Sequence, residues 1–158
     1  MTNESREHFI ADQVRALATI LLTRRGDLTI VETKKHTGLD FHVTIDREDK
    51  SMRLMFGVLL RGVPSPVTPD QASKVLEPTM GQFQGMREFT YPDCLFLFAL
   101  REEQAFFYWL AEPVVNDGVP KLVHHNKANV VPLTNEFLER VIQQIVGWYD
   151  SVEAVLIA

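Results

Sequence analysis

The residues of this chain best suited to chemistry are an aspartate and an arginine on two neighbouring predicted strands. Asp40 lies on the first of these strands, and Arg61 ends the second. One class of nucleases places a carboxylate on one strand, and an acidic or amide residue, a spacer and a lysine on the next, and uses a divalent metal to hydrolyse phosphodiesters. Leu59 stands at the middle position here, and its side chain has no atom that binds a metal. The pattern indicates a metal-hydrolysis site that keeps the first carboxylate and has replaced the rest.

The ligand requirements of magnesium and manganese leave two outcomes open for this site. Mg²⁺ takes hard oxygen ligands, usually from one or two carboxylates together with water and substrate phosphate. The candidate metal ligands are Asp40 and Glu7, provided that the first helix brings Glu7 close. Arg61, the second candidate catalytic residue, stays protonated and cannot act as a base. The site is therefore either a weak Mg²⁺ or Mn²⁺ site, or an Asp40–Arg61 ion pair that needs no cofactor.

For three histidines and the cysteine, a structural interpretation is preferred. His42 lies two residues after Asp40 on the same predicted face and is able to orient it, although a structural histidine is the commoner case. His124 and His125 are adjacent, so a strand would point them to opposite sides, and we assign them to the surface. Cys94 lies in an apolar run, which is typical of a buried, unreactive thiol.

Length and composition predict one globular domain over residues 1–158. The chain is 46% hydrophobic and 23% charged, and its single cysteine excludes an internal disulfide and indicates a reducing cytoplasm. No apolar run approaches the roughly 20 residues that cross a bilayer, and the charged N-terminus has no signal-peptide pattern. The net charge of −5 argues against a free-standing nucleic-acid binder, which usually carries a basic face.

The first half of the chain is typical of a helix followed by three strands. Ser5 is the expected cap of the helix, and Gly26 is its expected end. Its apolar residues recur at steps of four, three and four: Ile10, Val14, Leu17 and Leu21. Strands are expected over residues 28–33, 39–45 and 52–61. The last of them is apolar on both faces, so we expect it at the centre of the sheet.

The middle of the chain predicts a short helix, a long connection and a hairpin. Thr68 and Pro69 predict a helix start, and the helix is expected to end near Leu76. Residues 78–92 are expected to form an irregular connection that either covers the sheet or lines a cleft. Further strands are expected over residues 95–100, 105–110 and 121–124.

The end of the chain predicts a closing helix capped by Thr134. Its apolar stripe consists of Phe137, Val141, Ile145, Trp148 and Val152. The tail from Val155 to Ile157 is too apolar to be loose, so we expect it to dock on the core or on a partner chain. Together these elements predict an α/β (α+β) fold of three layers, α/β/α, with a mixed central sheet.

Two motifs and the order of the elements carry a resemblance to a known family. The motifs are Gly38-Leu39-Asp40 and Val58-Leu59-Leu60-Arg61. They resemble the Gly-Ile-Asp and Val-Gln-x-Lys motifs of a bacterial domain family of unknown function that has a restriction-endonuclease-like fold of the PD-(D/E)XK type. The likeness extends from about Glu7 to Asp150 and includes Phe107-Tyr108-Trp109. It implies that fold with a degenerate active site, but a fold does not fix an activity.

Three functional hypotheses follow from the sequence. The first is a non-catalytic binding or regulatory module with a protein or nucleic-acid partner, which also self-associates through a face that includes the last helix and the tail. The second is a weak Mg²⁺- or Mn²⁺-dependent nuclease that uses Asp40, Glu7 and Arg61. The third is a small-molecule binder that uses a cleft under residues 78–92.

Overall fold

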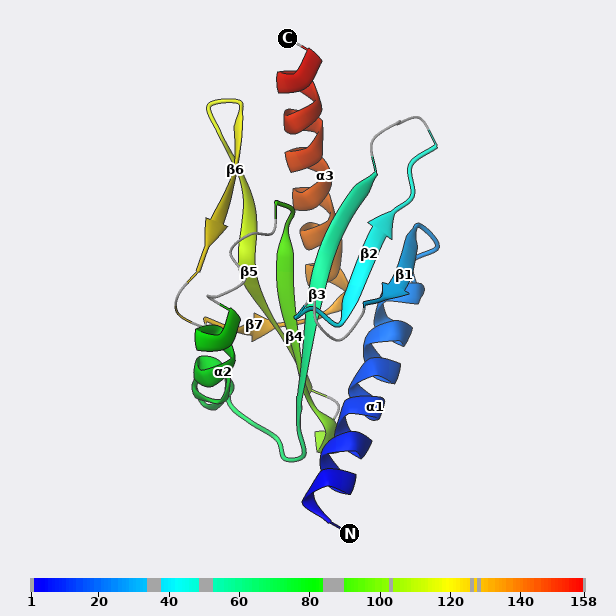
Figure 1. The fold of residues 1–158 in the computed structure, drawn as a ribbon, viewed down its shortest axis with the longest axis vertical. Helices are drawn as coiled ribbons and strands as arrows, with labels where there is room; N and C mark the ends of the chain where they lie inside the picture. The colour runs from blue at the N-terminus through cyan, green and yellow to red at the C-terminus, as the bar shows by residue number, and fades with distance from the viewer. Residues whose placement is uncertain are drawn as a thin grey trace.

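Seven β-strands form one mixed sheet that carries three α-helices in the part of the chain that the structure describes (Figure 1). The computed structural model describes residues 2–33, 38–48, 53–83, 90–102, 104–125, 127 and 129–157. The helices are α1 (Asn3–Thr23), α2 (Pro69–Phe83) and α3 (Asn135–Ile157). The strands are β1 (Leu28–Glu32), β2 (Phe41–Ile45), β3 (Leu54–Val63), β4 (Asp93–Ala99), β5 (Gln104–Asn116), β6 (Val119–His124) and β7 (Val131–Pro132), with a 3₁₀ turn, η2 (Leu100–Glu102), between β4 and β5.

The sheet is antiparallel except at its centre. Its strands lie in the order β1-β2-β3-β4-β5-β6, and β7 pairs with β5. Only β3 and β4 are parallel among the described pairs, in a register that runs from Gly57 opposite Asp93 to Val63 opposite Ala99. Parallel neighbours need a crossover connection, and α2 lies within it. The expectation of a mixed sheet is confirmed, and the strand predicted over residues 52–61 lies at its centre as β3, Leu54–Val63; Met52 lies outside the described residues.

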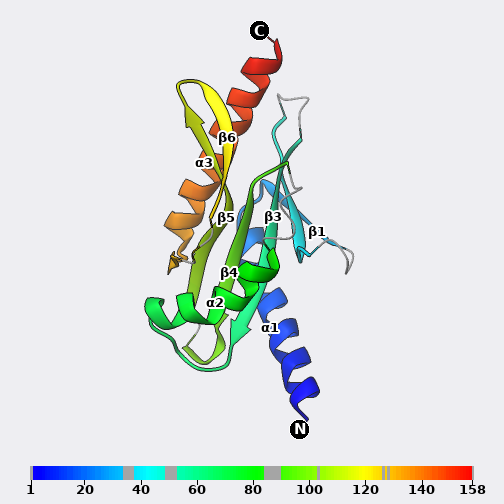
Figure 2. The same ribbon diagram turned by 60° about the vertical axis from the view of Figure 1, so that its left-hand side comes forward.

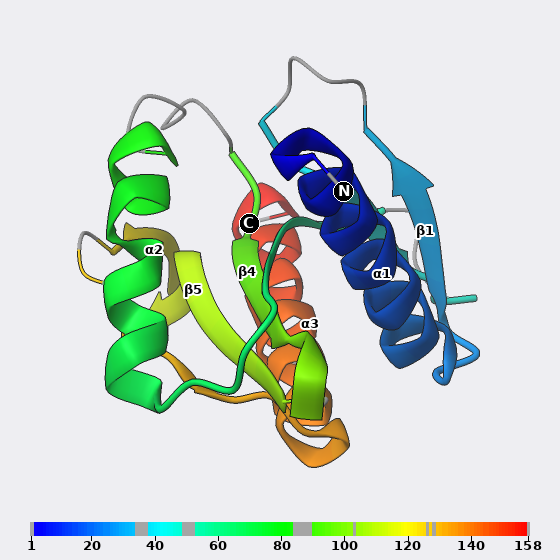
Figure 3. The same cartoon turned by 90° about the horizontal axis from the view of Figure 1, so that it is seen from below.

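Helices cover both faces of the sheet, α1 and α3 on one side and α2 on the other (Figure 2). Figure 3, seen from below, shows α1 and α3 on one side of β4 and β5 and α2 on the other. The larger core cluster lies under α1 and α3 and includes Val14, Phe56, Phe96 and Ile145; the smaller one lies under α2 and includes Leu59, Leu76, Leu97 and Phe106. None of the helices among the described residues is both long and apolar enough to cross a membrane.

Helix α1 begins and ends earlier than its sequence predicts. Thr2, not Ser5, is the N-cap, because the Thr2 hydroxyl accepts the backbone N–H of Ser5 at 3.2 Å. The helix ends at Thr23 with Arg24 as its C-cap, so Gly26 lies outside it and does not terminate it. Threonine and serine are both good caps, and the one whose backbone is extended takes the position. Here that residue is Thr2.

Helix α2 is longer than expected. Thr68 caps it as predicted, with its hydroxyl accepting the Gln71 N–H at 3.2 Å. The helix does not end near Leu76, however, but continues through Pro78 to Phe83. Leu76 is fully buried against the sheet, and we attribute the continuation to this packing, which outweighs the hydrogen bond that proline cannot donate.

The long connection predicted after α2 is therefore shorter than expected, and residues 84–89 of it lie outside the described residues.

Helix α3 is confirmed, with Thr134 accepting the Phe137 N–H at 3.0 Å. Its last turn carries Val155, Leu156 and Ile157, which are 54%, 72% and 75% exposed. The tail does not dock on the core of its own chain, because α3 extends past the ends of the strands (Figure 1).

Helix α1 packs closely on β3 at a glycine. A Cβ atom at Gly62 would lie 2.4 Å from Val14 Cγ2 and 2.9 Å from Ile10 Cγ2. Both distances are shorter than real carbon contacts, so any larger residue here would force the helix away from the strand. Gly62 therefore sets the distance between α1 and the sheet.

Replacing Gly62 by alanine tests this packing. We expect Gly62→Ala to lower the free energy of unfolding by about 1–3 kcal/mol, since the added methyl overpacks the α1–β3 contact. Urea denaturation followed by circular dichroism measures the change. Gly26→Ala is the matched control, because a Cβ at Gly26 meets nothing within 4 Å. An equal effect of the two substitutions would contradict the assignment.

Candidate functional site

Asp40 lies at the entry to β2, where β3 holds both its backbone and its side chain. Gly38 has a φ of 81°, a left-handed conformation that suits glycine, and turns the chain just before this point. The Asp40 N–H donates to the Val58 carbonyl at 2.9 Å, and Asp40 Oδ2 accepts the Leu60 N–H at 2.7 Å. Hydrogen bonds to an ionised group are stronger than neutral ones, so the carboxylate is fixed against β3.

Helix α1 contributes a second partner of this carboxylate, Arg15. Its Nη2 donates to Asp40 Oδ1 at 3.2 Å, and its Nη1 lies 3.7 Å from Glu32 Oε1. The guanidinium also stands over the Phe41 ring, 5.9 Å from the ring centroid. No pattern in the sequence singles out Arg15, which lies on a helix far from Asp40 along the chain. The one available signal is its place beside Val14, at the edge of the buried stripe of α1.

The structure also brings Arg61 to Asp40, but at a longer distance. Arg61 Nη1 lies 3.9 Å from Asp40 Oδ2 and donates to the Leu60 carbonyl at 2.7 Å. Arg15 is thus the closer cation of the two. Two guanidinium groups and one backbone N–H surround a carboxylate whose side chain is only 23% exposed.

The three residues proposed for the nuclease alternative line one pocket, which we call the Asp40 pocket. It has a volume of about 750 Å³ and is lined by Glu7, Ile10, Ala11, Val14, Arg15, Asp40, Leu60, Arg61 and Gly62. Glu7 comes from the exposed first turns of α1, Asp40 from the entry to β2, and Arg61 from β3. The lining combines apolar side chains from α1 and β3 with charged side chains of both signs.

The donor set of the Asp40 pocket does not fit a hard divalent cation. Both oxygens of Asp40 already accept hydrogen bonds, from Arg15 and from Leu60. Mg²⁺ needs oxygen ligands in near-octahedral geometry, and two nearby guanidinium groups repel it. Across the described ranges, no group of three or more His, Cys, Asp or Glu side chains is placed to hold a metal ion.

His42 and Asp40 do not share a face of the sheet, contrary to the predicted alternation, and the contact of His42 with Tyr91 fits the preferred structural interpretation of this histidine. Its Nε2 lies 3.1 Å from the Tyr91 hydroxyl, and burial lowers the pKa of His42. His42 lies opposite Gly57 on the neighbouring strand, and residues opposite one another in a sheet share a face. Leu39 packs beside Gly57 and belongs to the cluster under α2, so this shared face is the one that α2 covers. The predicted common face is wrong because the strand alternation begins only after Asp40. Asp40 turns to α1, whereas His42 stands on the α2 face.

A buried carboxyl that sequence reasoning missed lies on the same face. Asp93 is 1% exposed, and neither of its carboxyl oxygens has a hydrogen-bond partner in the described part of the chain. It stands beside Gly57, where a Cβ would come within 2.3 Å of Asp93 Oδ1. Burial raises the pKa of Asp93 to about 8. The carboxyl group is therefore mostly protonated at neutral pH.

The two adjacent histidines are not both free surface residues. His125 Nε2 lies 2.9 Å from Glu112 Oε1, and Gln144 from α3 donates to Glu112 Oε2 at 3.1 Å. His124 and His125 line one pocket of about 580 Å³ together with Tyr108, Trp109, Glu112, Lys127 and Asn129. β6 ends at His124, so only the first of the two histidines lies on the strand.

Comparison with known proteins leaves the site to be interpreted from its own geometry. No protein-family model, no curated protein and no solved structure matches the chain.

The order of the two arginines around Asp40 is testable by stability measurements. We expect Arg15→Ala to cost about 1 kcal/mol of unfolding free energy and Arg61→Ala less, because the first contact is shorter and joins α1 to the sheet. Asp40→Ala should cost about 2 kcal/mol, since it leaves the Leu60 N–H without its acceptor. A double-mutant cycle between Arg15 and Asp40 measures the coupling. Zero coupling would show that the pair does not form.

The buried Asp93 makes stability depend on pH. Its folded pKa, about 8, lies above the ordinary value of 3.8, so between these values the folded state holds a proton that the unfolded state has lost. Stability should therefore fall as pH rises from about 4 to 8, by up to about 1.4 kcal/mol per pH unit. Asp93→Asn removes this slope, and urea titrations of both proteins at several pH values measure it. Asp12→Asn, at an exposed site, should keep the wild-type slope; a wild-type slope in Asp93→Asn would refute the assignment.

Proposed function

We propose that this chain is a non-catalytic binding module with a restriction-endonuclease-like fold, in which an arginine-bound carboxylate stands at the former metal position. The fold part of the proposal rests on the order of elements, a helix and three strands followed by a helix and a strand, and on the approach of Asp40 and Arg61 across β2 and β3. The functional part rests on the contacts of Asp40.

The observation that carries the proposal is the occupation of both Asp40 oxygens by groups of the chain itself. Arg15 takes Oδ1 and the Leu60 N–H takes Oδ2. A metal ion would have to displace Arg15 and overcome the charge of Arg61, and Leu59 offers no side-chain ligand in return. The arginine cations thus supply the positive charge that a metal would otherwise bring.

The lining of the Asp40 pocket favours a protein segment as the ligand. A nucleic-acid surface is usually basic, whereas this pocket mixes Glu7 and Asp40 with Arg15 and Arg61 and the whole chain has a net charge of −5. Apolar side chains such as Ile10 lie beside these charges. A peptide that carries both an apolar and a charged side chain matches such a mixture.

A weak Mg²⁺- or Mn²⁺-dependent nuclease is the second candidate, because Glu7, Asp40 and Arg61 line the same pocket. In that case the two carboxylates would hold the ion, and Arg61 would stabilise charge on the phosphate. The two candidates differ in one property, which is affinity for the metal at Asp40.

Calorimetric titration of Mn²⁺ into the wild type and Asp40→Ala decides between them. We expect no heat of specific binding in either protein, since Arg15 and Leu60 already satisfy the carboxylate. Asp12→Ala, which removes an exposed carboxylate of α1 that does not line the pocket, is the control for surface binding. Wild-type binding that disappears only in Asp40→Ala, together with metal-dependent cleavage of single- or double-stranded DNA, would replace the proposal by the nuclease.

A further inference from the structure

The side of α3 that points away from the sheet forms one exposed stripe. Its members recur at alternating steps of four and three residues, and all are exposed: Glu136, Arg140, Gln143, Gly147, Asp150 and Ala154. A Cβ at Gly147 would meet no atom within 4 Å. Asp150 is already fixed in place, because Arg47 donates to its Oδ1 at 3.0 Å. We call this stripe the outer face of α3.

The outer face of α3 is complementary to itself when two copies run antiparallel. With a two-fold axis level with Ile145, Arg140 stands opposite the partner's Asp150, and the partner's Arg140 stands opposite Asp150. The same register sets Gln143 against the partner's Gly147, where the missing side chain leaves room for close approach. A two-fold axis makes every contact twice, so this register produces two ion pairs of opposite charges.

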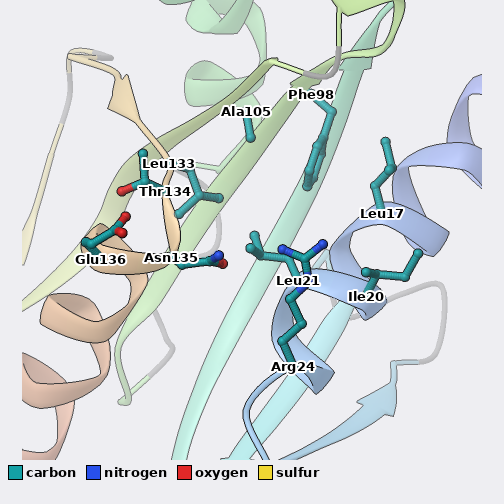
Figure 4. A pocket seen from close by; sticks show the side chains of 10 residues that line it. All are labelled: Leu17, Ile20, Leu21, Arg24, Phe98, Ala105, Leu133, Thr134, Asn135 and Glu136. Carbon is teal, nitrogen blue, oxygen red and sulfur yellow. The ribbon is translucent and has the colours of Figure 1, made fainter.

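A pocket of about 380 Å³ opens at the N-terminal end of α3, between α3 and α1 (Figure 4). Figure 4 shows apolar side chains from α1 and from the sheet around it, and polar side chains at the start of α3. The lining residues are Leu17, Ile20, Leu21, Arg24, Phe98, Ala105, Leu133, Thr134, Asn135 and Glu136. We call it the helix-junction pocket.

The register that pairs the charges also sets the apolar end of one helix level with this pocket. Ile157 of the partner subunit falls level with Leu133, and Val155 of the partner subunit falls level with Asn135. Both are highly exposed in the single chain, at 75% and 54%. The C-terminal end of a helix is negative, so the partner's last turn also suits the Arg24 side chain at the pocket.

We propose that two copies of this chain associate through antiparallel α3 helices, with the last turn of each at the helix-junction pocket of the other. Three separate features select a second copy as the occupant: the opposite charges of Arg140 and Asp150, the open space at Gly147, and the apolar last turn level with a pocket that α1 and the sheet line with apolar side chains. This interface goes beyond the proposed function, because it does not depend on whether the Asp40 pocket binds a metal or a peptide.

Sedimentation equilibrium over a range of concentrations tests the association. We expect the wild type to form a dimer, and Arg140→Glu to raise the dimer Kd at least about tenfold, since it replaces each of the two ion pairs by a pair of like charges. Ile157→Glu should weaken the dimer by a similar factor. Arg6→Glu makes the same charge change on the exposed start of α1 and should leave the Kd unchanged.

Disulfide cross-linking tests the register itself. Gln143→Cys and Gly147→Cys are made as separate proteins, and the natural Cys94 is buried and does not compete. In the antiparallel register a cysteine at 143 faces one at 147 of the other copy. The cysteines at position 143 of the two copies are offset by about 6 Å along the helices. The lateral spacing between the helices adds to this offset. That separation exceeds the reach of a disulfide, about 7 Å between Cα atoms.

The mixture of the two variants should therefore cross-link under mild oxidation, and either variant alone should not. A wild type that stays monomeric overturns the proposal. So does a dimer that Arg140→Glu leaves intact, or cross-linking that is no stronger in the mixture than in the single variants. Manganese titration of Asp40 has no bearing on these outcomes, so failure of one proposal is distinguishable from failure of the other.

Discussion

The burial of β3 on both faces is the constraint from which most of the structure follows. β3 pairs with β2 on one side and with β4 on the other, and helices cover both of its faces. Other parts of the chain contact β3 through its backbone and through its two glycines. Gly57 leaves space for the Asp93 carboxyl, the Leu60 N–H holds Asp40, and Gly62 admits α1. The candidate site is thus built around a strand that offers few polar side chains of its own.

The burial of Leu59 follows from the same constraint. Leu59 is 3% exposed in the cluster under α2, at the position where the proposed fold would place a polar metal ligand in an active nuclease. A carboxylate or an amide placed there would lose its hydration without gaining a partner, at a cost of several kcal/mol. A leucine at this point stabilises the packing of α2, and its side chain has no atom that binds a metal. Asp40 then takes its positive partners from α1 and β3, as Arg15 and Arg61.

The sequence was a good guide where one repeated pattern decides the outcome. The strand that is apolar on both faces was correctly predicted at the centre of the sheet, and the caps Thr68 and Thr134 marked two helix starts. It failed where residues distant in the chain meet. Arg15 reaches Asp40 only through the packing of α1, and Asp93 was hidden as the first residue of an apolar strand. His42 was misplaced because the alternation of β2 does not extend back to Asp40.

Helix α1 lines both the Asp40 pocket and the helix-junction pocket. A substitution that moves α1 therefore affects both pockets, and only a substitution that leaves α1 in place tests self-association by itself. One side of α1 carries Arg15 and lines the Asp40 pocket, and another carries Leu17 and Leu21 and lines the helix-junction pocket. Replacing Asp40 removes its hydrogen bond with Arg15 of α1. Because α1 also lines the helix-junction pocket, a resulting shift of the helix is enough to weaken self-association. Arg140 and Gly147 lie on α3 and do not line either pocket, so their replacement leaves the Asp40 contacts in place. A dimer that responds to Arg140 but not to Asp40 therefore locates the interface on α3, whereas a response to Asp40 alone would place the association at α1.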